Sequence, residues 1–364
     1  MKISTKVLIT RKIIVLGWIL LLGLILYLPN FIPLFFAHKT INILVWPGIF
    51  SSQVIDDFQK ESGIRVNISY FDSNEELLTK IKATNGEGYD LILPTDYGAY
   101  NLIKNKLLKP IDRQKLNFWS RINPIFLNHY FDPQNQYTIP VSWDVLGLGY
   151  NKNLISQILN PSWRYIFDPK FLVNSGIIMT NDALEAILIS SIYLYGSPEA
   201  IDKTKLNSIE KLLKTQKPIV KAYTEFRPDY YLITKNANIA LMASIYLWRS
   251  KTIYPELDFV MPEEGTLLTI ESLAIPKRSN KENLIYKFIN YLYEPKIIKR
   301  HLSQYTLLPV TNENVEGLVI SDLVKKMFSI KREELNKFNF MKYDYFREPI
   351  TESTIQNSWI EVKA

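Results

Sequence analysis

Three short apolar stretches, INILVW (residues 41–46), IRVNISY (64–70) and YDLILP (89–94), follow one another early in the chain. Each has the length of a β-strand, and β-branched residues are frequent in the first two. The two segments between them carry apolar residues at helical spacing: Val54, Ile55 and Phe58 in the first, Leu77, Leu78 and Ile81 in the second. This alternation predicts a β-α-β-α-β unit and an α/β fold with a largely parallel sheet.

The expected helices also carry signals at their ends. Gly63 follows the first helix, where a residue that accepts positive φ is favoured. Ser73 and Glu76 have the spacing of a capping box at the start of the second helix. Both signals support the order of elements given by the apolar pattern.

A second series of elements begins near Leu146, and 364 residues are too many for one hydrophobic core. The chain then seems to return to the first series, because a strong amphipathic helix with Leu284, Phe288 and Leu292 on one face follows a further strand. The additional elements expected are strands at 177–179, 239–242, 259–261 and 272–276 and a helix at 182–193. We therefore predict two α/β lobes joined by more than one crossing, with a ligand cleft between them.

The N-terminus has the pattern of an export signal or a membrane anchor. An apolar run covers residues 13–28 and continues at 31–37, and it follows the basic residues Lys2, Lys6, Arg11 and Lys12. Phe35 stands where a cleavage site after Ala37 would have a small residue, which favours an uncleaved anchor over a cleaved leader. The basic flank predicts that everything after His38 lies outside the cytoplasm.

Composition excludes several classes of function. The net charge is +7, but without the four basic residues of the N-terminal segment 39 basic residues face 36 acidic ones, and no basic cluster with interleaved aromatics suggests a nucleic-acid groove. There is no Cys, and the three His residues lack metal-site spacing. Nucleotide-binding and serine-hydrolase motifs are absent, so neither a cofactor nor an enzymatic reaction is expected.

A few polar and aromatic residues stand at the ends of expected strands. Asp182 and Glu185 open a helix directly after a strand, and their spacing places both carboxylates on one side of its first turn. Helix capping alone would explain this pair. Trp46 and Tyr97 lie just past strand ends, where α/β proteins often contact ligands, although core packing would also explain them.

The order of several segments resembles the spermidine/putrescine-binding family of periplasmic proteins, which serve ABC importers. The resemblance covers about residues 41–309 and rests on the number and order of its segments. They are ILVW (43–46), FQKESGIRV (58–66), SNE (73–75), GYDLILPT (88–95), FDP (131–133), YTIP (137–140) with Trp143, TNDA (180–183), PEEG (262–265) and ESLAIP (271–276).

This resemblance implies a two-lobed type II periplasmic-binding fold that closes about a hinge around a linear polyamine. Carboxylates would receive the ammonium groups, and aromatic faces would sandwich the methylene chain and add cation–π attraction. The positions that match the binding residues of the family are Trp46, Thr95, Tyr97, Asp182, Glu185 and Glu271. Glu271 replaces the usual Asp of the family and reaches one methylene further.

The chain departs from the family at three aromatic positions. Two family Trp positions fall on Ala243 and Thr269, and a family Tyr falls on Leu308. The nearby aromatic residues that could compensate are Tyr246, Trp248, Tyr223 and Phe226. These departures leave open two rivals: a binding protein of the same fold for another solute, and a membrane-tethered sensor.

The resemblance also implies a division of the chain, a location and partners. We expect an N-terminal segment at 1–38, lobe 1 at 39–145 and 269–312, lobe 2 at 146–268, and C-terminal helices at 313–364 that belong mainly to lobe 2. The expected location is the periplasm or the outer face of the cytoplasmic membrane. The expected partners are an ABC permease and its cytoplasmic ATPase, and the binding protein itself is expected to be a monomer.

Overall fold

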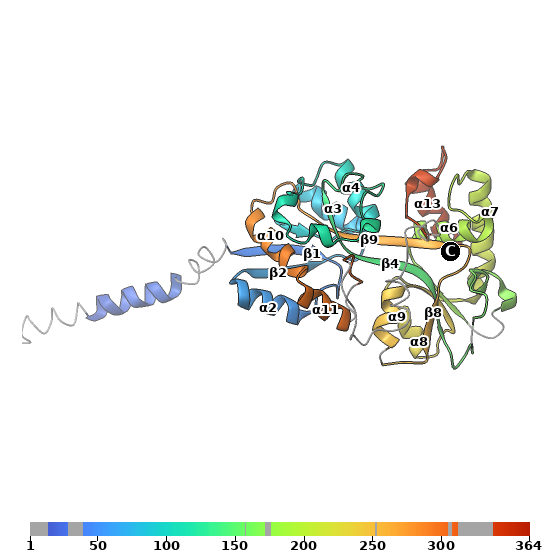
Figure 1. The fold of residues 1–364 in the computed structure, drawn as a ribbon, viewed down its shortest axis with the longest axis horizontal. Coiled ribbons are helices and arrows are strands. Elements are labelled where there is room, and N and C mark those ends of the chain that lie inside the picture. The colour runs from blue at the N-terminus through green and yellow to red at the C-terminus, as the bar shows by residue number, and fades with distance from the viewer. Residues whose placement is uncertain are drawn as a thin grey trace, which may run out of the picture.

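A computed structural model describes residues 14–27, 39–156, 158–171, 176–251, 253–304, 308–311 and 338–364. Its elements from residue 39 onward form two lobes joined by the long strands β4 (Thr138–Asn151) and β9 (Thr266–Ala274), as Figure 1 shows. The α/β class and the two lobes agree with the sequence prediction.

Lobe 1 contains the predicted β-α-β-α-β unit. Strands β1 (Thr40–Val45), β2 (Arg65–Tyr70) and β3 (Leu91–Ile92) alternate with helices, and β1 pairs in parallel with both neighbours. β3 is shorter than the expected strand at 89–94. The helices of this lobe are α2 (Ser52–Ser62), α3 (Asn74–Thr84), α4 (Asp96–Lys104), α10 (Glu282–Leu292) and α11 (Pro295–Ser303). The return of the chain to lobe 1 after residue 266 is therefore confirmed.

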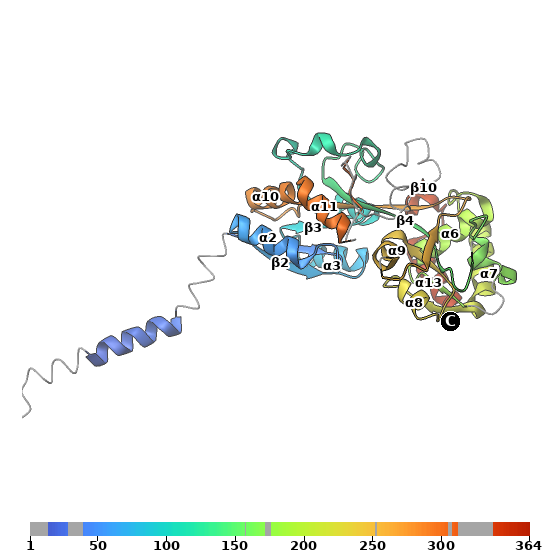
Figure 2. The ribbon, with the colours of Figure 1, turned by 60° about the horizontal axis from the view of Figure 1, so that its bottom comes forward.

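Lobe 2 is built in the same way around β5 (Ile177–Met179), which pairs in parallel with β6 (Val220–Tyr223) and β7 (Ile239–Ala243). Strand β8 (Leu257–Val260) is antiparallel to β4. The helices of this lobe are α5 (Arg164–Phe167), α6 (Ala183–Tyr195), α7 (Lys203–Gln216), α8 (Asp229–Ile233), α9 (Ser244–Lys251) and α13 (Glu352–Lys363). Figure 2 shows α13 within this lobe, where it contacts α6 and α7.

Strands β4 and β9 were the main omission of the sequence prediction. Residues 138–145 of β4 pair with β9, and residues 146–151 of β4 pair with β7 and β8 in lobe 2. The pairs β4–β9, β4–β7, β4–β8 and β3–β9 are antiparallel. The prediction of a largely parallel sheet is therefore wrong, because the chain crosses between the lobes in one direction and returns in the other.

The remaining short elements are one strand and several single-turn helices. Strand β10 (Phe338–Asn339) pairs with β9, so the C-terminal segment passes beside the crossing strands. The 3-10 helices are Arg113–Lys115, Trp119–Arg121, Pro124–Phe126, Pro169–Phe171, Lys217–Ile219 and Tyr343–Tyr345.

The capping residues act much as the sequence predicts. Gly63 ends α2 with φ of 68°, and its N–H donates to the Gln59 carbonyl. The Ser73 side chain accepts a hydrogen bond from the Glu76 N–H at the start of α3. The Glu76 carboxylate, however, accepts from the N–H of Asp72 and not from that of Ser73, so the capping box is displaced by one residue.

A buried carboxylate fixes the start of β4. Asp132 is 4% exposed, and its two oxygens accept four hydrogen bonds at 2.8–2.9 Å. The donors are the N–H groups of Gln136, Tyr137 and Thr138 and the Thr138 hydroxyl. The loop before the crossing strand is thereby folded around one side chain, which gives the FDP and YTIP segments a physical reason to occur together.

The N-terminal segment is described only at residues 14–27, which form a helix. Its large apolar side chains are exposed, and both views show it apart from the two lobes (Figures 1 and 2). In the described part of the chain, no helix combines the length and apolar character needed to cross a membrane. Residues 28–37, the second half of the expected anchor, lie outside the described residues, as do residues 313–337 of the expected C-terminal helices.

Candidate ligand-binding site

A cavity of about 560 Å³ lies between the lobes, and all six residues predicted from the sequence line it. Trp46, Thr95 and Tyr97 come from lobe 1, Asp182 and Glu185 come from lobe 2, and Glu271 comes from the crossing strand β9. The structure therefore brings into one cleft residues that are up to 225 positions apart in the chain.

The wall of lobe 1 is formed where its parallel strands end, a common place for ligand contacts in α/β folds. Trp46 follows β1 and packs against Phe71 with ring centroids 4.3 Å apart. Thr95 follows β3 and caps α4, because its hydroxyl accepts a hydrogen bond from the Gly98 N–H. Tyr97 lies in the first turn of α4, and its ring contacts that of Tyr343 with centroids 5.3 Å apart.

The wall of lobe 2 carries Asp182 and Glu185 at the start of α6. Asp182 caps this helix by accepting the Glu185 N–H at 2.7 Å, as the alternative interpretation of the sequence requires, yet it also lines the cavity. Burial raises the pKa of Asp182 to about 6 against the opposing effect of this hydrogen bond, and the charge of Glu75 adds to the rise. Burial together with the charges of Asp182 and Glu225 raises the pKa of Glu185 well above its usual value.

The crossing strands contribute two further carboxylates. Glu271 of β9 lies opposite Ser142 of β4, and Asp144 lies opposite Thr269. Burial raises the pKa of Glu271 to about 7, with the Asp144 charge acting in the same direction. Burial also raises the pKa of Asp144 to about 6, although its carboxylate accepts hydrogen bonds from the Ser244 hydroxyl and from backbone N–H groups.

A guanidinium group lies close to this pair of carboxylates. Arg249 of α9 lines the cavity, and its positive charge opposes the rise in the pKa of Glu271. Its Nη2 donates to the Gly48 carbonyl at 3.1 Å, which connects α9 of lobe 2 to the loop after β1 in lobe 1. Arg249 is the only Lys or Arg among the described residues that line the cavity.

Sequence reasoning missed several residues of the cleft. Asp144 could have been suspected, because it is the one charged residue in the apolar run VSWDVLGLGY (141–150). Glu225, Arg249 and Tyr343 lie in loops or short elements with no distinguishing pattern around them. Their place in the cleft follows from tertiary contacts alone.

The three departures from the family pattern have different outcomes. Ala243 and Thr269 line the cleft, whereas Leu308 is buried in the core and does not contribute to the lining. Of the aromatic residues expected to compensate, Tyr246 and Phe226 line the cleft. The expectation for the other two is wrong. Trp248 faces the core and is 1% exposed, and Tyr223 packs edge-on against Trp359.

The lining of this cleft suits an elongated cation. Seven carboxylates line it against one guanidinium group, and five aromatic rings lie among them. The carboxylates are Asp72, Glu75, Asp144, Asp182, Glu185, Glu225 and Glu271, and the rings are those of Trp46, Tyr97, Phe226, Tyr246 and Tyr343. Carboxylates hold ammonium groups by charge-assisted hydrogen bonds, and aromatic faces attract both cations and methylene chains. Among the described residues, no group of three or more potential ligands is arranged to hold a metal ion.

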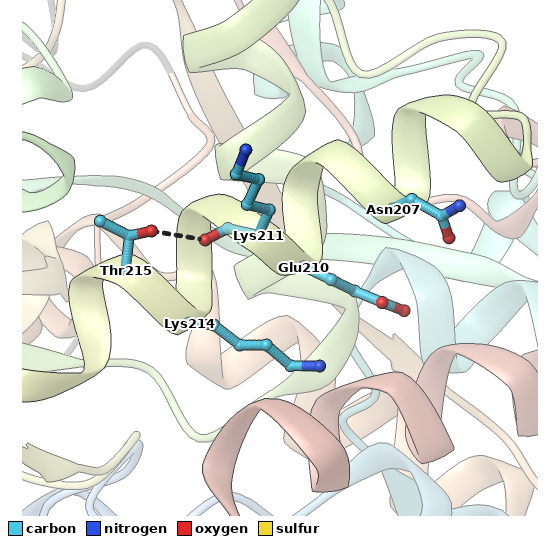
Figure 3. Close-up of a pocket in the computed structure, with 5 residues that line it drawn as sticks. All are labelled: Asn207, Glu210, Lys211, Lys214 and Thr215. Atoms are coloured by element: carbon cyan, nitrogen blue, oxygen red, sulfur yellow. Dashed lines mark hydrogen bonds between the residues drawn. The ribbon is translucent and has the colours of Figure 1, made fainter.

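A second hollow, on α7, lacks these properties. Figure 3 shows its lining residues, all of which belong to that one helix: Asn207, Glu210, Lys211, Lys214 and Thr215. The Thr215 hydroxyl donates to the Lys211 carbonyl at 2.8 Å and so serves the helix itself. This surface offers one carboxylate and no second wall, so the cleft between the lobes remains the candidate site.

Two lobes that enclose a polar and aromatic cleft, joined by crossing strands, define a protein of the solute-binding class. Residues 88–349 match the family model of bacterial extracellular solute-binding proteins, and the chain belongs to this family.

Proteins similar to this chain include polyamine-binding ones. The chain is 27% identical over 263 residues to the spermidine/putrescine-binding periplasmic protein of Escherichia coli, covering 72% of this chain and 75% of that protein. It is 28% identical over 267 residues to spermidine/putrescine-binding periplasmic protein 1 of Haemophilus influenzae, covering 72% and 73%. A structure described as a putative spermidine/putrescine ABC transporter from Listeria monocytogenes has a TM-score of 0.76 and 28% identity, covering 89% of this chain and 99% of that one.

Proposed function

We propose that this protein captures a polyamine such as spermidine or putrescine in its cleft and delivers it to an ABC permease driven by a cytoplasmic ATPase. Its role is binding and transfer, and the chain itself catalyses no reaction. The observation that carries the proposal is the lining of one cavity by seven carboxylates and five aromatic rings with a single guanidinium group. The names of the similar proteins described above agree with this ligand class.

The proposed roles follow the chemistry of a polyamine. Asp182 and Glu185 receive an ammonium group at the start of α6, and Glu271 receives another at the crossing strands. Trp46 and Tyr97 hold the methylene chain between them, each ring contributing roughly 0.5–2 kcal/mol of cation–π attraction. Thr95 supplies a hydroxyl beside the ring of Tyr97.

Closure of the lobes about the crossing strands completes the proposed mechanism. The proposed lobe boundary at 145/146 is supported by β4, whose pairing changes from β9 to β7 at this point. The boundary at 268/269 is supported by β9, where pairing with β4 begins at Leu268. A ligand that contacts both walls binds the closed state more tightly and therefore shifts the population toward it.

We place the lobes in the periplasm or at the outer face of the cytoplasmic membrane, and the protein acts there as a monomer. The basic and apolar N-terminal sequence supports export, followed by tethering or by cleavage. N-terminal sequencing of protein from intact cells distinguishes the two, because a mature chain that starts at His38 or Lys39 requires cleavage.

A second candidate function is the binding of another cationic solute, one that also carries an oxygen acceptor. The specific observation in its favour is Arg249, whose guanidinium lines the cleft beside Glu271. Ala243 and Thr269 also leave that part of the cleft without the aromatic faces expected from the family. A cationic amino acid would suit this arrangement.

Calorimetric titration of residues 39–364 tests the proposal. Spermidine or putrescine should bind, while sugars and neutral amino acids should not, because neither places two cations in an acidic cleft. Small-angle scattering of the saturated sample should show a more compact particle. Tight binding of an amino acid, with no heat on addition of either polyamine, would reject the proposed ligand class and favour the second candidate.

Polyamine affinity should fall as the pH is lowered from 8 to 6. In the empty cleft Glu271 has a pKa of about 7 and Asp182 a pKa of about 6, so both take up protons in this range and lose the charge that holds an ammonium group. The ligand amines remain charged, as Lys does, and therefore add no opposing change. We expect the dissociation constant to rise about tenfold or more, with proton release on binding detected in buffers of different ionisation enthalpy. Affinity that is constant from pH 8 to 6 would show that these carboxyls do not contact the ligand.

A further inference from the structure

The seven carboxylates of the cleft are distributed unevenly. Glu75, Asp182, Glu185 and Glu225 form one group, which we name the α6 cluster, and Asp144 and Glu271 form a second group at the crossing strands with Arg249 beside them. The members of the α6 cluster influence one another electrostatically: Glu75 acts on Asp182 and Glu225, and Asp182 and Glu225 act on Glu185. The α6 cluster therefore holds more negative charge than one ammonium group can neutralise.

Two members of this cluster approach it from different lobes. Glu75 lies in the first turn of α3 in lobe 1, and Glu225 follows β6 in lobe 2. Among the described residues, neither carboxylate has a hydrogen-bond or ion-pair partner, although both line the cavity. The repulsion between them across the cleft opposes closure as long as no cation lies between them.

The nearest cation does not fill this gap. Lys363 lowers the pKa of Glu225, but its Nζ donates to the Asn181 side chain at 2.7 Å and lies 5.2 Å from the centre of the Trp359 ring. Lys363 is also absent from the lining of the cavity. Two carboxylates without partners on opposite walls of a ligand cleft are therefore available to a further positive group of the ligand.

We propose that Glu75 and Glu225 are specificity-determining residues that hold an additional ammonium group between the lobes, so that the cleft prefers a linear triamine to a diamine. This inference rests on the proposed function. One terminal ammonium of the triamine binds Asp182 and Glu185, the other binds Glu271, and the third lies between Glu75 and Glu225. A diamine fills the first two positions and leaves the opposed carboxylates of the cleft mouth unneutralised, which penalises its closed complex.

Calorimetric titration of Glu225→Gln and Glu75→Gln with spermidine and with putrescine at pH 8 and low salt tests the inference. The wild type should bind spermidine more tightly than putrescine. Each variant should lose about tenfold in spermidine affinity, because one charge-assisted contact becomes neutral, while putrescine affinity should stay within about twofold. Glu263→Gln, which removes an exposed carboxylate outside the cleft, should change neither affinity. Equal melting temperatures across the variants exclude a general loss of folding.

The outcomes separate this inference from the proposed function. A wild type that binds neither amine overturns both. A wild type that binds the two amines equally, or variants that weaken both amines by the same factor, overturn only the preference for a triamine. A selective loss of spermidine affinity in both variants supports the additional ammonium position, since the two carboxylates belong to different lobes.

Discussion

Asp182→Asn and Glu271→Gln should each weaken spermidine binding about tenfold, and the double variant should weaken it about a hundredfold. A hydrogen bond to a charged group contributes roughly 1.5–3 kcal/mol, about twice the neutral value, and each amide keeps the shape of the side chain while it removes the charge. Asp182 and Glu271 come from α6 and from β9, so their effects on affinity should combine almost independently. Titration calorimetry and thermal melting of the same samples measure affinity and stability side by side.

Asp202 provides a matched control for Asp182. It caps α7 just as Asp182 caps α6, because its Oδ1 accepts the Lys205 N–H at 2.9 Å, but it does not line the cavity. Asp202→Asn should leave both affinity and melting temperature nearly unchanged, since Asn is also a good N-cap residue. If Asp182→Asn behaves like Asp202→Asn, Asp182 is only a helix cap and the polyamine site is wrong.

Asp132→Ala should lower the free energy of unfolding by about 3 kcal/mol or more. The substitution leaves three backbone N–H groups and one hydroxyl without their acceptor at a site that is 4% exposed, and each unsatisfied buried group costs about 1–3 kcal/mol. Asp132→Asn should cost less, because its remaining oxygen can still accept from Tyr137 and Thr138. Urea denaturation followed by circular dichroism gives both values.

Asp112→Ala serves as the comparison for this stability effect. Asp112 accepts one N–H, from Gln114 at 3.1 Å, and its side chain is 46% exposed, so its loss should cost under about 1 kcal/mol. Equal destabilisation by Asp132→Ala and Asp112→Ala would contradict the role of Asp132 in fixing the start of β4.

The local elements of this protein could be predicted because their signals are contained in short stretches of sequence. The apolar positions Val54, Ile55 and Phe58 mark the buried face of α2, and Gly63 adopts the positive φ that its position after the helix requires. The start of α6 was also placed to within one residue, since Asp182 has the chemistry of an N-cap. In each case the residues that interact are fewer than five positions apart.

The crossing strand β4 was missed for a physical reason. All 14 of its residues are buried, so the strand lacks the alternation of apolar and polar positions that marks a sheet with one exposed face. Its Gly, Ser and Asp residues interrupt the apolar run and made it resemble a loop. The mixed direction of the sheet depends on this strand and on β9, so it too could not be read from the local pattern.

The sequence by itself determined the two α/β lobes, the helix caps and, through the family resemblance, six residues that line one cleft. Only the tertiary structure decided that Asp144, Glu225, Arg249 and Tyr343 join them, and that Trp248 faces the core. Local periodicity reports which face of an element is buried but not which distant element covers it. The crossing strands bring residues from positions 46 to 356 around one cavity, and that assembly fixes the charge distribution on which the choice of ligand depends.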